Sequence, residues 1–268
     1  MQKKEIEICE PNLANDLTQG LRQGAFSIVL QPKVFLDNRR IMGAEILSRW
    51  HHPRFGKIAP DVWVLMAESQ GLMRELTEWL VHKALQSMHL EMQLAINVCP
   101  SVFDDKLIDF IAEKFAQAGA SPQMLELELT ESVKPNSLDQ LAEAVRYAQA
   151  LGFRVALDDF GVGFSSMNYL VELPVNTVKI DRSIVQKITH NRSATLVCKT
   201  LINLAHEVDA RVVCEGVETE EQCEALSMMG ADIVQGYLFG KPMPLEVAAL
   251  YLNNGLMSNF HRVERAIN

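Results

Sequence analysis

Acidic and amide side chains follow the apolar runs of this sequence. The stretch "RVALDDFGVGF" (154–164) carries two adjacent carboxylates, Asp158 and Asp159, directly after three apolar residues. Charged groups are costly to bury without partners, so such a pair is expected at a strand end, at the surface or on a metal ion. Other apolar runs end in the same way, on Glu45, Asn97, Glu128, Glu131, Lys179, Asp181, Glu215, Glu218 and Gln235.

A single acid after a strand usually serves as a turn or helix cap, but six successive strand ends with carboxylates or amides favour a shared function. Crowded like charges repel one another unless a cation neutralises them. Carboxylate and amide oxygens are the ligands that Mg²⁺ and Mn²⁺ prefer. Two adjacent aspartates suit a pair of such ions, which can clamp both oxygens of an in-line phosphoryl displacement. Lys179 is a candidate contact to the attacking water or to a phosphate oxygen, with a solvated or ion-paired lysine as the alternative.

Eight short apolar runs are predicted to be the strands that position these side chains. They are rich in Val, Ile and Leu and lack a clean polar alternation, as in strands covered on both faces. The runs are "FSIVLQP", "IMGAEILSRW", "LAINVCP", "MLELELTES", "FRVALDDFG", "NTVKIDRS", "RVVCEGVET" and "DIVQGYLFG". Most spacers between them have the apolar periodicity of helices, at 13–24, 60–71, 74–88, 136–152, 193–208 and 219–230. Thr219 and Gln222 suit a capping box at the start of the last helix.

The alternation of strands and helices predicts a parallel sheet, and eight such strands predict a barrel. The connection between the first two predicted strands differs, because Gln31 and Glu45 lie too close in sequence for a crossover helix between them. A turn is expected there, at Asp37 and Asn38. The expected fold is therefore α/β, a modified TIM (β/α)8 barrel with an antiparallel first strand. Residues 1–12 are expected to be a flexible lead-in and residues 13–268 a single barrel domain. In such barrels, reactive side chains cluster at the C-terminal ends of the strands.

Composition excludes several classes of protein. Of the 268 residues, 48% are hydrophobic and 22% charged, which suits a globular core and excludes a disordered chain. A net charge of −9 argues against binding to a DNA or RNA polymer. The five cysteines show no C-x-x-C spacing, which predicts reduced thiols in the cytoplasm. The sequence has no signal-peptide pattern and no apolar run of 18 or more residues, so no membrane insertion of this chain is expected.

The motifs "GAEILSRW", "INVCP", "LELELTES", "VALDDFGVGFSS", "VKIDRSIV", "CEGVETEEQ" and "QGYLFGKPMP" occur in one order along the chain. Together they resemble the EAL-domain phosphodiesterases, which hydrolyse cyclic di-GMP, over roughly residues 13–254. The resemblance implies a barrel whose first strand is antiparallel. It also implies metal-dependent hydrolysis of one phosphodiester bond of cyclic di-GMP, which leaves linear 5′-pGpG, with two Mg²⁺ or Mn²⁺ ions as cofactors and a homodimer as the assembly.

The resemblance also assigns roles to individual residues. It implies that one metal ion is held by Glu45, Asn97, Glu128 and Asp158, and that Asp158 bridges to a second ion completed by Asp159. Lys179, Glu215 and Gln235 would surround the attacking water, and either Glu215 or Lys179 would help to deprotonate it. Arg49 would pair with a substrate phosphate. The remaining implied roles are substrate contacts at Gln31, Leu47 and Asp181, and support of the loop after the double aspartate by Glu131 and Glu218.

Some positions depart from the usual pattern of the family, but none of them removes an implied metal ligand. They are Ile46 for alanine, Cys99 for serine, Val162 for threonine, Phe164 for tyrosine and Lys241 for arginine. Three alternatives to the phosphodiesterase stay open from the sequence. They are a non-catalytic cyclic di-GMP receptor that uses the same pocket, a scaffold that no longer binds nucleotide, and a Schiff-base barrel that uses Lys179.

Overall fold

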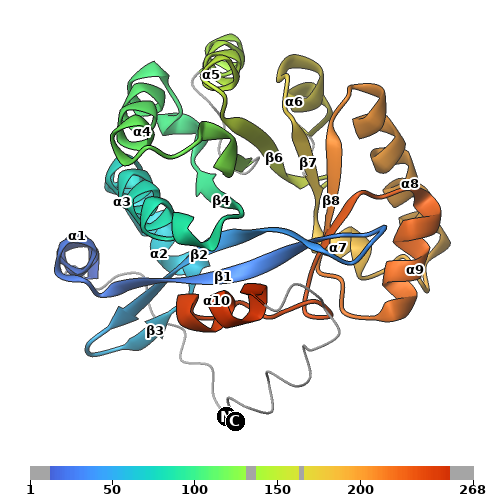
Figure 1. Cartoon of the computed structure of the whole chain (residues 1–268), viewed down its shortest axis with the longest axis horizontal. Coiled ribbons are helices and arrows are strands. Elements are labelled where there is room, and N and C mark those ends of the chain that lie inside the picture. The colour runs from blue at the N-terminus through green and yellow to red at the C-terminus, as the bar shows by residue number, and fades with distance from the viewer. Residues whose placement is uncertain (1–12, 131–136, 163–165, 254–268) are drawn as a thin grey trace.

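A computed structural model describes residues 13–130, 137–162 and 166–253 of the chain. Nine strands form one sheet in the order β1-β9-β8-β7-β6-β5-β4-β2-β3, and β1 also pairs with β2, so that eight of them close a barrel (Figure 1). The predicted α/β barrel is confirmed. The strands are β1 (Phe26–Phe35), β2 (Ile41–His52), β3 (Gly56–Ile58), β4 (Gln93–Val98), β5 (Leu125–Thr130), β6 (Arg154–Phe160), β7 (Thr177–Ile180), β8 (Arg211–Glu215) and β9 (Ile233–Gln235).

The first strand is antiparallel to both of its neighbours in the barrel, as its short link to β2 predicts. Gln31 lies opposite Glu45 on β2, and Lys33 lies opposite Gln235 on β9. From β2 through β4 to β9, neighbouring strands of the barrel are parallel. Their C-terminal ends therefore meet at one mouth of the barrel. The three-residue strand β3 pairs antiparallel with the end of β2, outside the barrel. It was too short to be predicted from a pattern.

Helices cover the outside of the barrel (Figure 1). The six helices predicted from periodicity are present, and the predicted capping box of Thr219 and Gln222 is formed. Four further described helices lie in segments for which no helix was predicted. The longest, α4, has Asp104 as its N-cap, whose side chain accepts a hydrogen bond from Leu107 N. The helices are α1 (Leu13–Gln23), α2 (Pro60–Ser69), α3 (Met73–Gln86), α4 (Asp105–Ala118), α5 (Leu138–Ala150), α6 (Ser166–Glu172), α7 (Arg182–Val185), α8 (Arg192–Glu207), α9 (Glu220–Met229) and α10 (Leu245–Asn253).

Two apolar clusters hold these elements together. The larger one joins the outer faces of the strands to the surrounding helices. The smaller one packs α1 and α2 on β2 around Phe26, Trp50 and Trp63, with the rings of Phe26 and Trp50 stacked 5.6 Å apart. The cysteines in the described part of the chain are free and buried. None of the described helices combines the length and the apolar composition needed to cross a membrane.

The inside of the barrel is charged as well as apolar. Lys33 on β1 is 1% exposed and its ammonium group contacts Glu126 at 3.0 Å and also Glu128, both on β5. Glu128 in turn lies 2.8 Å from the ammonium group of Lys179 on β7. We call these four residues the ion-pair column. Because buried charges need partners, the alternation of acid and base along the column explains how the barrel tolerates them.

Candidate active site

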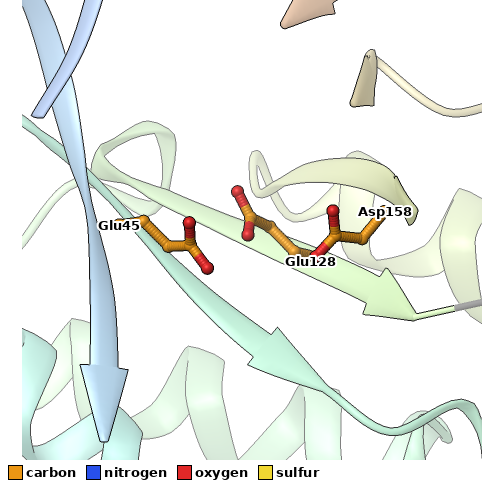
Figure 2. A group of neighbouring side chains, drawn as sticks. All are labelled: Glu45, Glu128 and Asp158. Carbon is orange, nitrogen blue, oxygen red and sulfur yellow. The ribbon is translucent and has the colours of Figure 1, made fainter. Parts of the chain in front are cut away.

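Carboxylates from three strands meet at the C-terminal mouth of the barrel. Glu45 on β2, Glu128 on β5 and Asp158 on β6 point toward one another, and each offers an oxygen within 4.8 Å of the others (Figure 2). All three are buried. A second group of the same kind joins Asp158 to Asp159 and to Glu215 on β8. The two groups share Asp158, which is the arrangement expected of a carboxylate placed between two cations.

Amide side chains orient the first of these groups. Asn97 on β4 donates to Glu45 Oε1 at 2.8 Å, and Gln235 on β9 donates to Glu45 Oε2 at 2.7 Å. Gln235 also donates to Gln31 Oε1 at 3.3 Å. The carbonyl oxygen Oε1 of Gln235 is buried and has no hydrogen-bond partner in the described part of the chain. An orphaned buried acceptor beside crowded carboxylates is suited to a bound cation or to a water on one.

The ammonium group of Lys179 lies at the centre of the acids. It is 2.7 Å from Glu215, 2.8 Å from Glu128, 2.9 Å from Asp158 and 3.6 Å from Glu45. Burial opposes its charge, but these carboxylates outweigh burial and raise the pKa of Lys179 well above its ordinary value. One ammonium group cannot neutralise all of them, so the site has room for added positive charge. The donor set of carboxylate and amide oxygens fits Mg²⁺ or Mn²⁺.

The carboxylates respond differently to this environment. Burial alone would raise the pKa of Glu128, but the ammonium groups of Lys179 and Lys33 lower it to about 2. Burial raises the pKa of Glu45 and of Asp158 despite the nearby lysine. Burial also raises the pKa of Glu215 to about 8. Without a cation, therefore, Glu215 is the acid that most readily keeps a proton near neutral pH.

A pH dependence of stability follows from Glu215. In the metal-free chain, raising the pH from 4.5 to about 8 should lower the free energy of unfolding, because the folded chain keeps a proton that the unfolded chain releases. Glu215→Gln should remove the contribution of Glu215 to the slope of the free energy of unfolding against pH. Urea unfolding of both metal-free proteins at a series of pH values measures the effect, and equal slopes in the two would contradict it.

The double aspartate lies in a local irregularity of β6. The pairing of β6 with β7 shifts register between Leu157 and Phe160. Asp159 has a φ of 56°, in the left-handed region that Asp and Asn adopt more readily than other residues with side chains. Its amide donates to Asp158 Oδ1 at 2.9 Å. Alternation along a regular strand would send adjacent side chains to opposite faces, whereas this bulge brings both carboxylates to the mouth.

Asp159→Asn should separate metal binding from folding. Asparagine also tolerates the left-handed backbone, so the variant should fold, while losing one anionic ligand should weaken Mn²⁺ binding by at least about tenfold. The melting temperature measured with and without Mn²⁺ reports this, since a ligand that binds only the folded state stabilises it. Asp209→Asn is the matched control, because exposed Asp209 has a φ of 59° away from the mouth. An unchanged Mn²⁺ shift in Asp159→Asn would exclude Asp159 as a ligand.

Some of the residues expected on the substrate side border a cavity of about 510 Å³ at this mouth. Leu47, Arg49, Asp158 and Asp159 line it. Arg49 is half-buried and donates to the carbonyl of Ser48 at 2.8 Å, and burial lowers the pKa of its guanidinium group. A partly buried guanidinium facing a cavity is suited to a phosphate.

The other sequence-predicted residues make hydrogen bonds within the protein or lie outside the described residues. Gln31 donates to the carbonyl of Gly240 at 3.2 Å. Asp181 caps α7, accepting a hydrogen bond from Ser183 N at 2.8 Å. Glu218 accepts one from the side chain of Gln186 at 3.2 Å. Glu131 lies outside the described residues.

Lys33 and Glu126 belong to the ion-pair column but were not predicted from the sequence. Thr177 donates a hydrogen bond to Glu126 Oε1 at 2.7 Å, so this carboxylate is held from two sides. The two-residue period of strands offered a signal. Lys33 follows Gln31 on the same face of β1, and Glu126 precedes Glu128 on the same face of β5.

The fold and the site together define a barrel of the (β/α)8 type with an acidic mouth, whose carboxylates are grouped closely enough to hold a metal ion. A model of the EAL domain family matches residues 14–242, and the chain belongs to this family. A similar protein is the bifunctional diguanylate cyclase/cyclic di-GMP phosphodiesterase MucR of Pseudomonas aeruginosa, 33% identical over 242 residues, which are 87% of this chain and 35% of that protein. The cyclic di-GMP phosphodiesterase RocR of the same organism is 33% identical over 252 residues, 90% of this chain and 63% of that protein.

A solved structure agrees with these relatives. The PaMucR phosphodiesterase in complex with c-di-GMP superimposes with a TM-score of 0.81 at 33% identity, over 88% of this chain and 98% of that one. The chain spans about a third of the length of the first curated relatives that it matches. The comparisons therefore establish the family of this barrel.

Proposed function

We propose that this chain is a metal-dependent phosphodiesterase that hydrolyses cyclic di-GMP to linear 5′-pGpG. The proposal rests on the two clusters of three acidic residues that have Asp158 in common. They lie beside a cavity lined by Arg49. Paired cations in such groups suit an in-line displacement at phosphorus. The names of MucR and RocR, and the c-di-GMP complex of PaMucR, support cyclic di-GMP as the substrate.

Two Mg²⁺ or Mn²⁺ ions are the proposed cofactors. Glu45, Asn97, Glu128 and Asp158 would hold one, and Asp158 with Asp159 would hold the other. Bound there, the ions would activate a water and stabilise the charge that develops on the phosphate. The crowded acids, the single central ammonium group and the orphaned oxygen of Gln235 support this assignment.

Of the two candidate bases, we propose Glu215 as the proton acceptor for the attacking water. Lys179 is held protonated by four carboxylates, so it is suited to orient Glu215 and to contact a phosphate oxygen rather than to accept a proton. Gln235 would help to position the water. Arg49 would pair with the substrate phosphate, and the proposed further substrate contacts are Gln31, Leu47 and Asp181.

The remaining expectations stay proposals as well. We propose a cytoplasmic homodimer in which Glu131 and Glu218 support the loop after the double aspartate. Among the departures from the family pattern, Ile46 is buried in the larger apolar cluster and also lines the cavity at the mouth. Val162 is 61% exposed and contributes no hydroxyl group to that loop.

Chromatography of cyclic di-GMP incubated with the purified chain and Mg²⁺ tests the function. Formation of pGpG, its absence with EDTA and its return with added Mg²⁺ are the expected results. Intact substrate at high protein concentration would contradict the proposal. Calorimetry with Ca²⁺ would then distinguish a receptor, which binds the nucleotide, from a scaffold, which does not.

A further inference from the structure

A second cavity lies at the opposite, N-terminal mouth of the barrel, with a volume of about 570 Å³. This volume is in the range of small-molecule sites, about 300–1,000 Å³. Two of its lining residues, Arg154 and Arg211, begin the strands β6 and β8. Four amide side chains line it too, and no carboxylate of the described residues does, although the chain has a net charge of −9. The amides are Gln93, Gln123, Gln149 and Asn176.

The guanidinium group of Arg154 has one ion pair among the described residues, and it is a long one. Its nearest carboxylate oxygen is Glu126 Oε1 at 3.9 Å. That carboxylate already accepts a hydrogen bond from Thr177 at 2.7 Å and contacts the ammonium group of Lys33 at 3.0 Å. The Nε–H group of Arg154 is buried and has no acceptor among the described residues. A buried charged donor without an acceptor is costly, so the protein compensates the charge of Arg154 only partly.

Arg211 adds a second positive charge on the same cavity. Its side chain is exposed and makes no ion pair within the described part of the chain. Arg154 and Arg211 line the same cavity, and burial lowers the pKa of Arg154, with the positive charge of Arg211 adding to this effect. An oxyanion between them would relieve the repulsion and could accept paired hydrogen bonds from either planar group.

We propose that this N-terminal mouth binds a small phosphate monoester, with its phosphate between Arg154 and Arg211. The cavity exceeds what a free phosphate ion needs, and its amides offer donors and acceptors to a polar organic part. Gln149 is already positioned by Pro174 O and Asn176 Oδ1, at 2.5 and 3.0 Å. This site is independent of the catalytic proposal, because it shares no residue with the acidic mouth.

The Nε–Hε resonances of arginine in metal-free, ¹⁵N-labelled protein provide a direct test. EDTA removes cations that would draw phosphate to the acidic mouth. Titration with ribose 5-phosphate, and separately with inorganic phosphate, should shift the resonance that disappears in Arg154→Gln. A stronger response to ribose 5-phosphate identifies a monoester site. An equal response shows that free phosphate is the ligand and overturns the monoester. Ribose alone should produce no shift.

Three variants make the outcome decisive. Arg154→Gln and Arg211→Gln should each weaken binding of ribose 5-phosphate by about tenfold or more, since each removes a charged hydrogen-bond donor. Arg192→Gln, which removes an exposed arginine on α8, is the matched control and should bind as the wild type does. Arg211→Gln is an exposed substitution and keeps the test valid if Arg154→Gln fails to fold. No shift at millimolar ribose 5-phosphate, or equal affinity in Arg211→Gln and wild type, would overturn the proposal.

Discussion

Glutamine in place of Glu45 is expected to lower the rate of pGpG formation by about a thousandfold. Both carboxylate oxygens of Glu45 are fixed by amide donors, so its charge is aimed at the space between Glu128 and Asp158. Removing that charge should weaken binding of the proposed cation between Glu45, Glu128 and Asp158. A bound metal contributes several kcal/mol to stabilising such a transition state, and each 1.36 kcal/mol is about a factor of ten in rate.

The matched control for Glu45→Gln is the same substitution at a glutamate outside the site. Glu143→Gln on α5 removes an exposed carboxylate remote from the mouth and should leave the rate unchanged. Chromatography of pGpG under saturating Mg²⁺ measures all three proteins, and Mn²⁺ titration followed by calorimetry tests whether affinity for the metal falls in Glu45→Gln. A Glu45→Gln enzyme with near-normal turnover would remove Glu45 from the site and would leave the family resemblance without its first metal ligand.

The second large effect concerns folding. Lys33→Met should lower the free energy of unfolding of the metal-free chain by about 3–5 kcal/mol, because breaking a buried ion pair leaves uncompensated charge. The ammonium group of Lys33 is the close cationic partner of Glu126 and one of two such partners of Glu128. Methionine fills a similar volume, so the loss would reflect charge and not a cavity. Urea unfolding monitored by circular dichroism measures it.

Two further variants define the cause. Lys33→Met combined with Glu126→Gln should recover part of the loss, because it removes the carboxylate that loses its close cationic partner in Lys33→Met. Lys199→Met, an exposed lysine on α8, should change stability by less than about 0.5 kcal/mol. If Lys33→Met were as stable as Lys199→Met, the ion-pair column would make no net contribution to folding.

Much of the barrel could be predicted because its signals are local. Each strand end combines an apolar run with a polar terminus, and the short first link allows only a turn, so the antiparallel β1 followed from chain length. The capping box of Thr219 and Gln222 depends on residues three apart. Local patterns also placed the site residues that the structure brings together, from Glu45 on β2 to Gln235 on β9.

The features that escaped prediction depend on distant partners or on backbone geometry. In the sequence, nothing near Lys33 distinguishes it from an ordinary surface lysine, because its partner Glu126 is 93 residues away. Asp159 was predicted beside Asp158 at the metal site, but the bulge and the left-handed backbone that bring both carboxylates to one mouth were not predicted. Asp181 was expected to contact substrate, and its role as the cap of α7 depends on where that helix begins.

The antiparallel first strand also dictates when the site can form during synthesis. Gln31 on β1 and Gln235 on β9 are 204 residues apart, and their hydrogen bond forms across the seam that closes the barrel. A growing chain emerges at about 5–20 residues per second, so β1 and β2 leave the ribosome well before their last neighbour exists. Until β9 arrives, Glu45 lacks one of its two amide donors and the sheet has an open edge. The proposed cation site is therefore completed late, when the two ends of the sheet join.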